Sequence, residues 1–234
     1  MDRNYALSFP LANDFNAYVN AALANGEITK DEWYALNNTY FTKLYLSQDN
    51  PRGQSGHGGG AQHYAYAHLP IVDAIYKDGT FLDVGCANGH LMEMVHQWAA
   101  AVGFDVQVYG IDISEGLVAL AKTRLPHWSD HLFLGNSFLW RPEQKFGYVH
   151  IGGLGQVPED DELALFDHLM EHYVADGGRL ILGPVWLDFS LDSRYLSMER
   201  LLASGVTPTG YVEKTHYSRP NMIRKAIWFD KGTR

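Results

Sequence analysis

A loop of small residues follows a predicted apolar strand and ends at the start of a predicted helix. The strand is Thr80–Val84, which carries one acidic residue, Asp83. The loop consists of Gly85, Cys86, Ala87, Asn88 and Gly89. Small residues let a ligand approach the backbone, and the amides of the next helix offer donors at a positive dipole end. In an open α/β sheet, ligands bind beyond the carboxyl ends of the strands, so we expect a ligand here.

The charge and spacing of this segment favour one kind of ligand over another. Asp83 disfavours an approaching pyrophosphate, whereas it attracts an ammonium group. Dinucleotide sites use G-x-G-x-x-G, and the spacing from Gly85 to Gly89 does not complete that pattern. The segment therefore favours a ligand with a cationic end.

Polar residues also end the next two predicted strands. Asp112 follows the strand Val106–Ile111, where a carboxylate can accept hydrogen bonds from both ribose hydroxyls. The alternative is that Asp112 shares with Ser114 the capping of the following helix. Gly135-Asn136-Ser137 follows the strand His131–Leu134 and is suitably placed for the edge of an adenine ring. Together these residues predict a nucleoside site.

Alternating strands and helices must position these residues. Further strands are predicted over Tyr148–Ile151 and Arg179–Leu182, and a hairpin over Tyr211–Tyr217 and Met222–Phe229. The predicted helices are Pro70–Tyr76, His90–Val102, Glu115–Leu125, Glu162–Val174 and Leu191–Leu202. This alternation predicts a parallel sheet covered on both faces, to which the hairpin adds an antiparallel strand.

The N-terminal region has a different character. Asn13–Ala24 predicts a first helix, and Thr29 with Glu32 forms a capping box at the start of a second. Behind the box, an apolar stripe at helical spacing consists of Trp33, Leu36, Tyr40 and Leu44. The stripe indicates a helical hairpin that packs on the main domain, or a lid over the substrate. Five glycines lie between residues 49 and 60, which predicts a loop. We divide the chain into a helical lid or cap over 1–48, a Gly-rich linker or hinge over 49–63 and a Rossmann-like domain over 64–234.

The three ligand-binding segments, in this order and spacing, resemble the nucleoside-binding motifs of class I S-adenosylmethionine-dependent methyltransferases. The similarity spans roughly residues 80–182, and the terminal hairpin fits the antiparallel last strand pair of that family. The resemblance implies a doubly wound, mostly parallel seven-stranded α/β sheet in the order 3-2-1-4-5-7-6, with strands numbered along the chain. It implies S-adenosyl-L-methionine as the cofactor.

The same resemblance assigns roles to individual residues. Asp83 and the Gly85–Gly89 loop would hold the methionine part, and Asp112 would hold the ribose. Ile113 would pack on the adenine, and Asn136 with Ser137 would meet its polar edge.

Two residues depart from the family pattern. Ala87 stands where the family has its central glycine, a small change for the loop. Asn136 stands where an acid is common, so its amide oxygen would accept from the adenine amino group without charge assistance.

Methyl transfer from a sulfonium is an in-line displacement, which needs a base where the acceptor must lose a proton. His150, near the end of a predicted strand, is one candidate; a hydrogen-bonded histidine beside the core is an equal alternative. His57, in the glycine-rich stretch, is another, although an exposed loop residue is the simpler interpretation. Walls of an acceptor pocket could come from Trp186, Phe189 and Tyr195, or these residues could only pack.

The spacing of the histidines does not predict a metal site. His63 and His68 are five residues apart, and neither HExxH nor another carboxylate–histidine pattern occurs.

Composition narrows the class of partner. The formal net charge is −9 with 18 basic residues, which disfavours nucleic acid as a partner and fits a small-molecule acceptor. Cys86 is the single cysteine, so we expect a reducing compartment and a cytoplasmic location. We expect neither a signal peptide nor a membrane segment. A homodimer through the N-terminal lobe is a further possibility.

Two other classes of protein remain open from the residues. An NAD(P)-dependent oxidoreductase can use a similar sheet, although the loop spacing argues against it. A non-catalytic nucleoside-binding or interaction protein could retain the pocket and bind its ligand without turnover.

Overall fold

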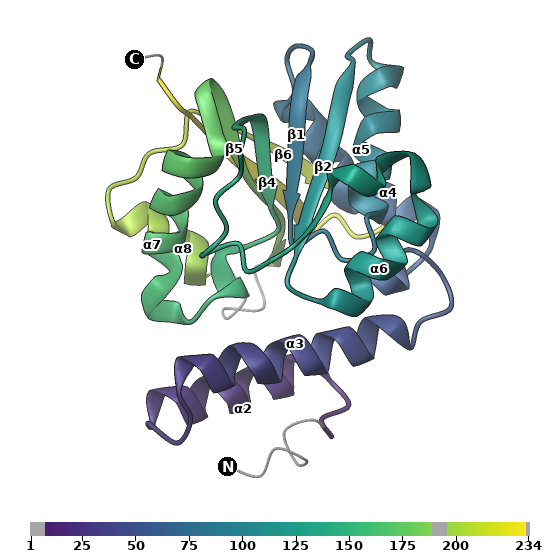
Figure 1. Ribbon diagram of the computed structural model, residues 1–234. Coiled ribbons are helices and arrows are strands. Elements are labelled where there is room, and N and C mark those ends of the chain that lie inside the picture. The colour runs from purple at the N-terminus through teal and green to yellow at the C-terminus, as the bar shows by residue number, and fades with distance from the viewer. Residues whose placement is uncertain (1–7, 189–195, 233–234) are drawn as a thin grey trace.

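The structure is a computed structural model that describes residues 8–188 and 196–232. Its centre is a seven-stranded sheet in the order β3-β2-β1-β4-β5-β7-β6 (Figure 1). The strands are β1 Gly79–Val84, β2 Val106–Asp112, β3 Leu132–Leu134, β4 Phe146–Ile151, β5 Val174–Asp188, β6 Gly210–Thr215 and β7 Met222–Asp230. Strands β1 to β5 pair in parallel, whereas β7 is antiparallel to both β5 and β6. The predicted fold class and strand order are confirmed.

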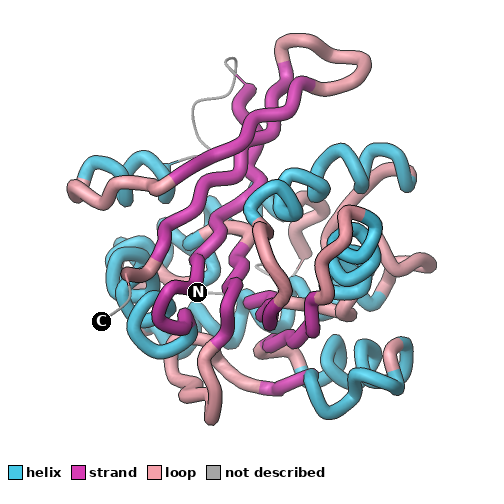
Figure 2. Tube along the Cα trace, turned by 90° about the horizontal axis from the view of Figure 1, so that it is seen from above, coloured by secondary structure: helices cyan, strands magenta, loops and turns pink. Residues whose placement is uncertain are grey.

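Helices cover both faces of this sheet, as Figure 2 shows from above. The α-helices of the described residues are α2 Ala12–Ala24, α3 Lys30–Leu46, α4 Ala61–His68, α5 His90–Ala101, α6 Glu115–Arg124, α7 Glu162–His168 and α8 Leu196–Ala203, of which α2 and α3 lie across the ends of the strands and not on a face. Side chains of a strand point alternately to opposite faces. Leu82 therefore joins the apolar core that contains α7, and Phe81 joins the core that contains α5 and α6. Together these two cores fix the carboxyl ends of β1, β2 and β4 side by side.

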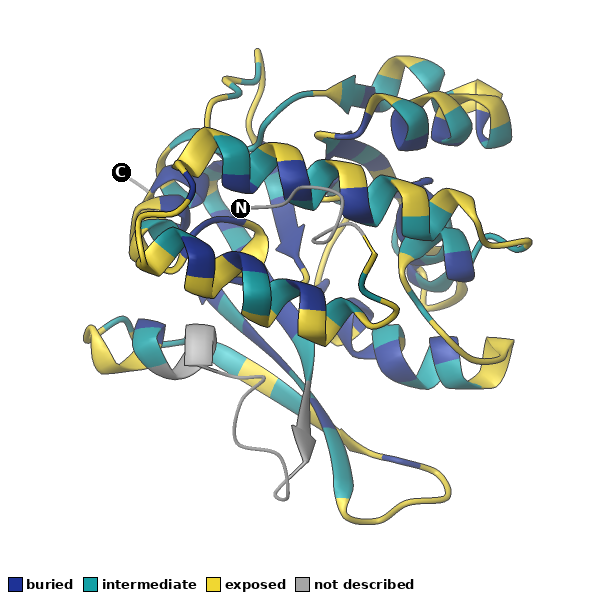
Figure 3. Cartoon of the chain, turned by 90° about the horizontal axis from the view of Figure 1, so that it is seen from below, coloured by how far each residue is buried: buried dark blue, intermediate teal, exposed yellow. Residues whose placement is uncertain are grey.

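The N-terminal helices α2 and α3 form a hairpin with an apolar core of its own, seen from below in Figure 3. The Thr29 hydroxyl accepts from the Glu32 amide at 3.2 Å, and the Glu32 carboxylate accepts from the Thr29 amide at 3.0 Å. The predicted capping box is therefore confirmed. The division of the chain at residues 48 and 63 stays a prediction.

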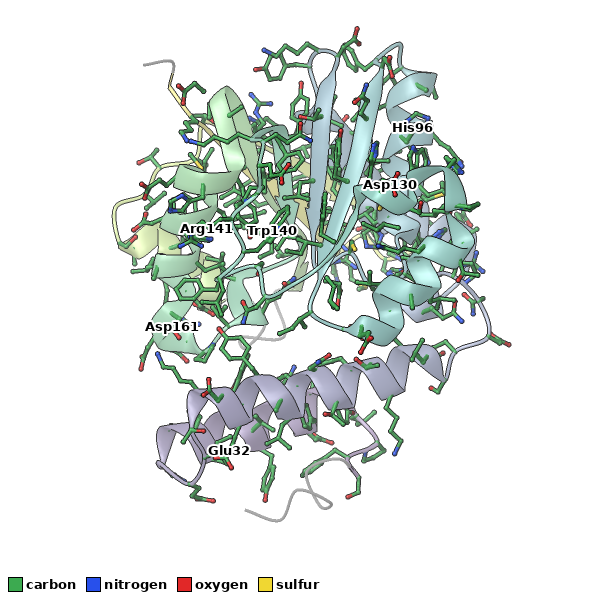
Figure 4. The ribbon with its side chains drawn as sticks, in the orientation of Figure 1. Glu32, His96, Asp130, Trp140, Arg141 and Asp161 are labelled. Atoms are coloured by element: carbon green, nitrogen blue, oxygen red, sulfur yellow. The ribbon has the colours of Figure 1, made fainter. Side chains whose placement is uncertain are left out.

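Helix α3 is attached to the main domain near both of its ends. Lys30 pairs with Asp161 at 2.6 Å, and the Thr42 hydroxyl donates to the Ser114 hydroxyl at 2.7 Å. Figure 4 labels Asp161 beside the N-terminal part of α3. The helix thus spans the carboxyl ends of the central strands.

Two predicted helices have different bounds in the structure. The helix predicted over Pro70–Tyr76 is a 3-10 turn, Leu69–Ala74, that follows α4. Proline lacks the amide hydrogen that α4 would need in order to continue, so a new turn begins there. The helix predicted over Glu162–Val174 gives way to a π-turn after His168.

The pair Gly177-Gly178, which follows that helix, lies inside β5. A Cβ on Gly178 would lie 2.9 Å from the carbonyl oxygen of Gly147, so this glycine permits close strand contact. Helix α8 begins at Leu196; Phe189, Tyr195 and the first residues of the predicted helix lie outside the described residues, as does the side chain of Trp186.

Candidate functional site

Two cavities open at the carboxyl ends of the central strands. The first, of about 300 Å³, lies between α3 and the ends of β2 and β3, and we call it the β2 cavity. Predicted site residues that line it are Gly85, Ala87, Asp112, Ile113, Asn136 and Ser137. The structure therefore brings the three sequence motifs together at one place.

The second cavity, of about 230 Å³, lies at the ends of β1, β4 and β5, and we call it the β1 cavity. Predicted site residues that line it are Asp83, Gly85, Cys86, Ala87 and His150. Residues common to both cavities are Tyr45, Ser55, Gly85, Ala87 and Gln156. The cavities therefore adjoin at the Gly85 loop.

The Asp112 carboxylate fixes the loop against β2. One oxygen accepts from the Ala87 amide at 2.8 Å, and the other accepts from the Ser114 amide at 2.8 Å. Burial raises the pKa of Asp112, and the same two amides oppose that rise. The Ser114 hydroxyl caps α6 by accepting from the Leu117 amide at 3.2 Å. Asp112 thus organises the loop and the helix start while it lines the β2 cavity.

Asp83 has a partner on the neighbouring strand. Its carboxylate lies 2.8 Å from Nδ1 of His150, whose Nε2 lies 2.6 Å from the carbonyl oxygen of Gly183. Asp83 and His150 are each 3% exposed. A carboxylate and a carbonyl oxygen both accept, so the form of His150 that satisfies both contacts donates from both ring nitrogens. The result is a compact, neutral ion pair in the wall of the β1 cavity.

The backbone of the loop takes left-handed conformations where the ligand would approach. Gly85 has φ of +79°, and a Cβ there would lie 2.6 Å from the side-chain nitrogen of Gln156. Ala87 has φ of +47°, an unfavourable value for a residue with a Cβ. The hydrogen bond to Asp112 holds Ala87 in this conformation.

Asn88 and Gly89 line neither cavity, and their place in the cofactor set stays a prediction. The Asn88 amide donates to the carbonyl oxygen of Pro51 at 3.0 Å, and its oxygen accepts from the His90 amide at 3.1 Å. A Cβ on Gly89 would lie 2.7 Å from Leu125. These two residues therefore set the start of α5 and hold the glycine-rich segment beside it.

The residues after β3 are partly engaged by the protein itself. The side-chain oxygen of Asn136 accepts from the Phe138 amide at 2.8 Å, which leaves its nitrogen as the free donor. The Tyr173 hydroxyl donates to the carbonyl oxygen of Ser137 at 2.6 Å. Ile113 is 39% exposed at this cavity and presents an apolar surface.

The two histidines that we predicted as bases have surroundings in the structure that do not favour that role. Both ring nitrogens of His150 are engaged, so it has no lone pair for an acceptor. His57 lines neither cavity, and burial, followed by His63 and Arg224, lowers its pKa to about 4. Its Nε2 is buried without a hydrogen-bond partner among the described residues.

The structure adds a histidine that the sequence did not single out. His68 lines the β1 cavity, and its Nδ1 lies 3.0 Å from the carbonyl oxygen of Tyr64. A carbonyl oxygen only accepts, so Nδ1 carries the hydrogen and Nε2 is an acceptor. Burial lowers the pKa of His68 to about 3, which keeps the ring neutral. The i, i+4 spacing of Tyr64 and His68 would have indicated this contact, but only after the helix α4 had been predicted.

Helix α3 contributes a second set of residues that sequence reasoning missed. Members of α3 that line the β2 cavity are Trp33, Tyr34, Asn37, Asn38, Phe41, Thr42 and Tyr45. The apolar stripe predicted on this helix instead packs into the core of the hairpin, apart from Trp33, which contributes to both.

The described residues contain neither a metal-binding cluster nor a membrane-spanning helix. In residues 8–188 and 196–232, no three histidine, cysteine or acidic side chains group closely enough to hold a metal ion. No helix in those residues is long and apolar enough to cross a membrane.

Comparisons with known proteins agree with this geometry. A family model described as a methyltransferase domain matches residues 75–135, which contain β1, β2, β3 and the Asp112 site. No curated protein sequence matches the chain.

Several solved structures share the fold. The 1,6-didemethyltoxoflavin-N1-methyltransferase of Burkholderia thailandensis, with its substrate and S-adenosylhomocysteine bound, is 14% identical with a TM-score of 0.59, over 88% of this chain and 91% of that one. The [4+2]-cyclase SpnF is 14% identical with a TM-score of 0.57, over 88% of this chain and 97% of that one. A Geobacter sulfurreducens methyltransferase in complex with S-adenosylhomocysteine is 14% identical with a TM-score of 0.51, over 80% of this chain and 96% of that one.

The domain match falls on the loops that line the two cavities, and the strand order is the one that the sequence motifs implied. The methyltransferase-domain model covers residues 75–135, and the chain as a whole has the strand order of the class I S-adenosylmethionine-dependent methyltransferase fold.

Proposed function

We propose that this protein transfers a methyl group from S-adenosylmethionine to a small-molecule acceptor by in-line displacement. The observation that carries the proposal is the pair of adjoining cavities, one beside Asp112 and one beside the Asp83–His150 pair. A nucleoside joined to an amino acid through a sulfonium has two polar ends of different chemistry, which suit the two cavities. The Burkholderia and Geobacter enzymes, which contain S-adenosylhomocysteine, support this cofactor.

In this proposal the nucleoside end occupies the part of the β2 cavity beside Asp112, Ile113 and Asn136, and leaves the side formed by α3 to the acceptor. Asp112 keeps lone pairs beyond those used by its two amides, so it accepts from the ribose hydroxyls. Ile113 packs on the adenine. Asn136 donates from its nitrogen to a ring nitrogen, because its oxygen is already engaged by Phe138. This assignment reverses the polarity that the sequence suggested for Asn136, and Ser137 stays at the ring edge.

The amino-acid end occupies the β1 cavity. A zwitterion has no net charge, and its ammonium and carboxylate need an acceptor and a donor. The Nε2 atom of His68 and the outer side of Asp83 accept from the ammonium, and the Tyr64 hydroxyl donates to the carboxylate. The neutral Asp83–His150 pair and the neutral His68 ring match a group without net charge, because unpaired buried charges are costly.

The sulfonium then lies where the cavities adjoin, beside Gly85 and Gln156. The donor is already activated, so the protein aligns the acceptor, the methyl group and the sulfur and excludes water. Good alignment of the reacting atoms can lower the activation free energy by about 7–11 kcal/mol. Helix α3 closes this region from the solvent side, which supports a lid function for the N-terminal hairpin.

Several finer expectations accompany this proposal. The acidic balance supports a small molecule over nucleic acid as the acceptor. A cytoplasmic location rests on the cysteine count, and a homodimer through the N-terminal lobe rests on its aromatic composition.

Isothermal titration with S-adenosylhomocysteine tests the proposal, with NADH as the matched comparison. We expect saturable binding of S-adenosylhomocysteine and none of NADH. Binding of NADH alone would indicate an oxidoreductase. Binding of S-adenosylmethionine without methyl transfer to any acceptor would indicate the non-catalytic alternative.

A further inference from the structure

We propose that the acceptor atom is an uncharged nitrogen of a planar heterocycle, which attacks the methyl group with its own lone pair and is held against α3 by the Tyr34 hydroxyl. The inference rests on the proposed function and adds the class of acceptor. Three observations carry it: the side chains where the cavities adjoin, the charges along the cavity walls, and the pattern of rings and amides on α3.

The residues common to both cavities supply hydrogen bonds but no base. The side chains available there belong to Tyr45, Ser55 and Gln156, of which only Tyr45 is titratable. Burial, followed by the charge of Asp112, raises the pKa of Tyr45 to about 12, so it is a neutral phenol. A general base works best when its pKa is near the working pH.

Other titratable groups of the described cavity walls are engaged elsewhere. His150 and Asp83 hold each other, and Asp112 holds two backbone amides. His68 has a free Nε2, but a ring whose pKa is about 3 is too weak a base to deprotonate an alcohol. An aliphatic hydroxyl, which attacks only as it loses its proton, is therefore a poor acceptor for this site.

The charges of the walls argue against an ionised acceptor as well. Among the described residues that line either cavity there is no lysine or arginine. A carboxylate or phenolate acceptor would lose its hydration when it enters the cavity, where its single cationic partner would be the sulfonium. The sulfonium loses that charge during the transfer. Burying an anion without a lasting partner is costly. A neutral acceptor avoids this penalty.

The cavity-facing side of α3 indicates the shape of that acceptor. Tyr34, Phe41 and Tyr45 recur at i, i+7 and i+11 and therefore lie on one face of the helix. Asn37 and Asn38 lie between the rings on the same side. Aromatic side chains stack on planar rings, and amides pair with ring nitrogens and carbonyl groups at the ring edge. This surface suits a heteroaromatic molecule.

The Tyr34 hydroxyl supplies a specific anchor. It is a buried oxygen without a hydrogen-bond partner in the described residues, and its side chain lines the β2 cavity. Burial, followed by the charge of Asp161, raises the pKa of Tyr34 to about 12, so the hydroxyl stays a neutral donor. Buried polar groups in native proteins are ordinarily paired, and a ligand atom would complete this one.

The reaction balances without a base. The nitrogen lone pair forms the new N–C bond while the C–S bond breaks and its electron pair goes to sulfur. The positive charge moves from the sulfonium to the methylated nitrogen, and S-adenosylhomocysteine leaves as a neutral thioether. Where that nitrogen carries a hydrogen, the proton passes to water after the transfer.

A panel of acceptors tests the chemistry, with S-adenosylmethionine saturating and methylated product measured by mass spectrometry. The probes are benzimidazole and quinoxaline as neutral nitrogen heterocycles, 2-naphthol as the hydroxyl analogue, and 2-naphthoate as the anion. We expect methyl transfer to a nitrogen heterocycle with a solvent isotope effect near one. Preference for 2-naphthol or 2-naphthoate, or transfer to none of the four, overturns the inference.

The Tyr34→Phe variant tests the anchor. Loss of one neutral hydrogen bond should raise the acceptor KM about three- to tenfold and leave the affinity for S-adenosylhomocysteine unchanged. Tyr40→Phe is the matched control, since its hydroxyl donates to the carbonyl oxygen of Phe9 and it lines neither cavity. An unchanged acceptor KM in Tyr34→Phe contradicts the anchor. If the wild-type protein does not bind S-adenosylhomocysteine, that result would instead contradict the proposed function.

Discussion

The carboxylates near the carboxyl ends of β1 and β2 lie in neighbouring strands but have different partners. Asp112 bonds two backbone amides and lines the larger cavity. Asp83 is buried against His150, which also bonds the carbonyl oxygen of Gly183. The first carboxylate organises a loop and bonds the amides of Ala87 and Ser114. The second is neutralised inside the wall.

The comparison shows that a residue's position in a motif does not determine its electrostatic role. Both acids follow an apolar strand, and both came out of the sequence as ligand-binding residues. The difference comes from β4, which pairs with β1 and places His150 opposite Asp83 in the strand register. A family motif therefore specifies the geometry of a site more reliably than the charge that the site presents.

The largest effect should follow the loss of the histidine of the buried pair. His150→Ala leaves the Asp83 carboxylate buried without a cation, which should lower the free energy of unfolding by about 3–5 kcal/mol. Urea denaturation followed by circular dichroism measures this. The double variant with Asp83→Asn and His150→Asn should recover part of the loss. A decrease under about 1 kcal/mol in His150→Ala would show that the pair is not the stabilising unit described here.

A somewhat smaller effect, on binding and not on stability alone, should follow the loss of Asp112. Asp112→Ala removes the ribose acceptor and both amide contacts, so the affinity for S-adenosylhomocysteine should fall at least about a hundredfold, or ~3 kcal/mol. Isothermal titration measures the dissociation constant. Glu115→Gln, an exposed acid three positions along the chain, is the control and should bind normally. Undiminished binding by Asp112→Ala would remove the ribose assignment.

The histidines beside the β1 cavity make stability depend on pH. Burial lowers the pKa of His68 to about 3 and that of His57 to about 4, below the 6.5 of an ordinary histidine. Between these values and pH 6.5 the unfolded chain binds more protons, so stability rises with pH across that window. The full stabilisation is present above pH 6.5 and declines as the pH falls toward 4.

Urea midpoints at several pH values between 4 and 7.5 test this dependence. His68→Gln should flatten the slope, because glutamine does not titrate. The groups that face His68 are His57, Tyr64, His150 and Arg224, and they are unchanged in this variant. An equal slope in His68→Gln and wild type would assign the dependence to other groups.

The smallest effect should come from the loop that lies between the two aspartates. Ala87→Gly relieves the cost of φ at +47°, so the free energy of unfolding should rise by about 1 kcal/mol. Thermal unfolding at fixed pH measures the gain. Ala101→Gly in α5 is the opposite control and should destabilise, because glycine is unfavourable in a helix. A lower melting temperature for Ala87→Gly would mean that the Cβ makes a contact worth more than the strain.

Local patterns were enough to predict the sheet and the ligand-binding loops. Strand and helix signals alternate along residues 80–182. Asp112 bonds the amides of Ala87 and Ser114, which lie with it among the consecutive elements β1, α5, β2 and α6. Helix α4 was missed because Pro70 and the preceding glycines obscured its short span. The partner of Asp83 was missed because it is 67 residues away in the chain.

Helix α3 shows a different limit of sequence reasoning. One apolar stripe was visible, and it packs inside the hairpin, as Leu36 and Tyr40 show. A second row of aromatic residues, which includes Tyr34 and Phe41, turns toward the main domain. When a helix has two apolar faces, its apolar residues do not concentrate on one side. The sequence pattern therefore did not distinguish the row that faces the cavity from the row that faces the core of the hairpin.

The two attachments of α3 differ in how they respond to the surrounding solution. Lys30 is half exposed where it meets Asp161, so dissolved salt screens that ion pair. The hydroxyl contact between Thr42 and Ser114 carries no charge and is largely indifferent to salt. Helix α3 is therefore attached at one end by a salt-sensitive ion pair and near the other end by an uncharged hydrogen bond. We therefore expect added salt to weaken the attachment of α3 near Tyr34 more than the attachment near Ser114.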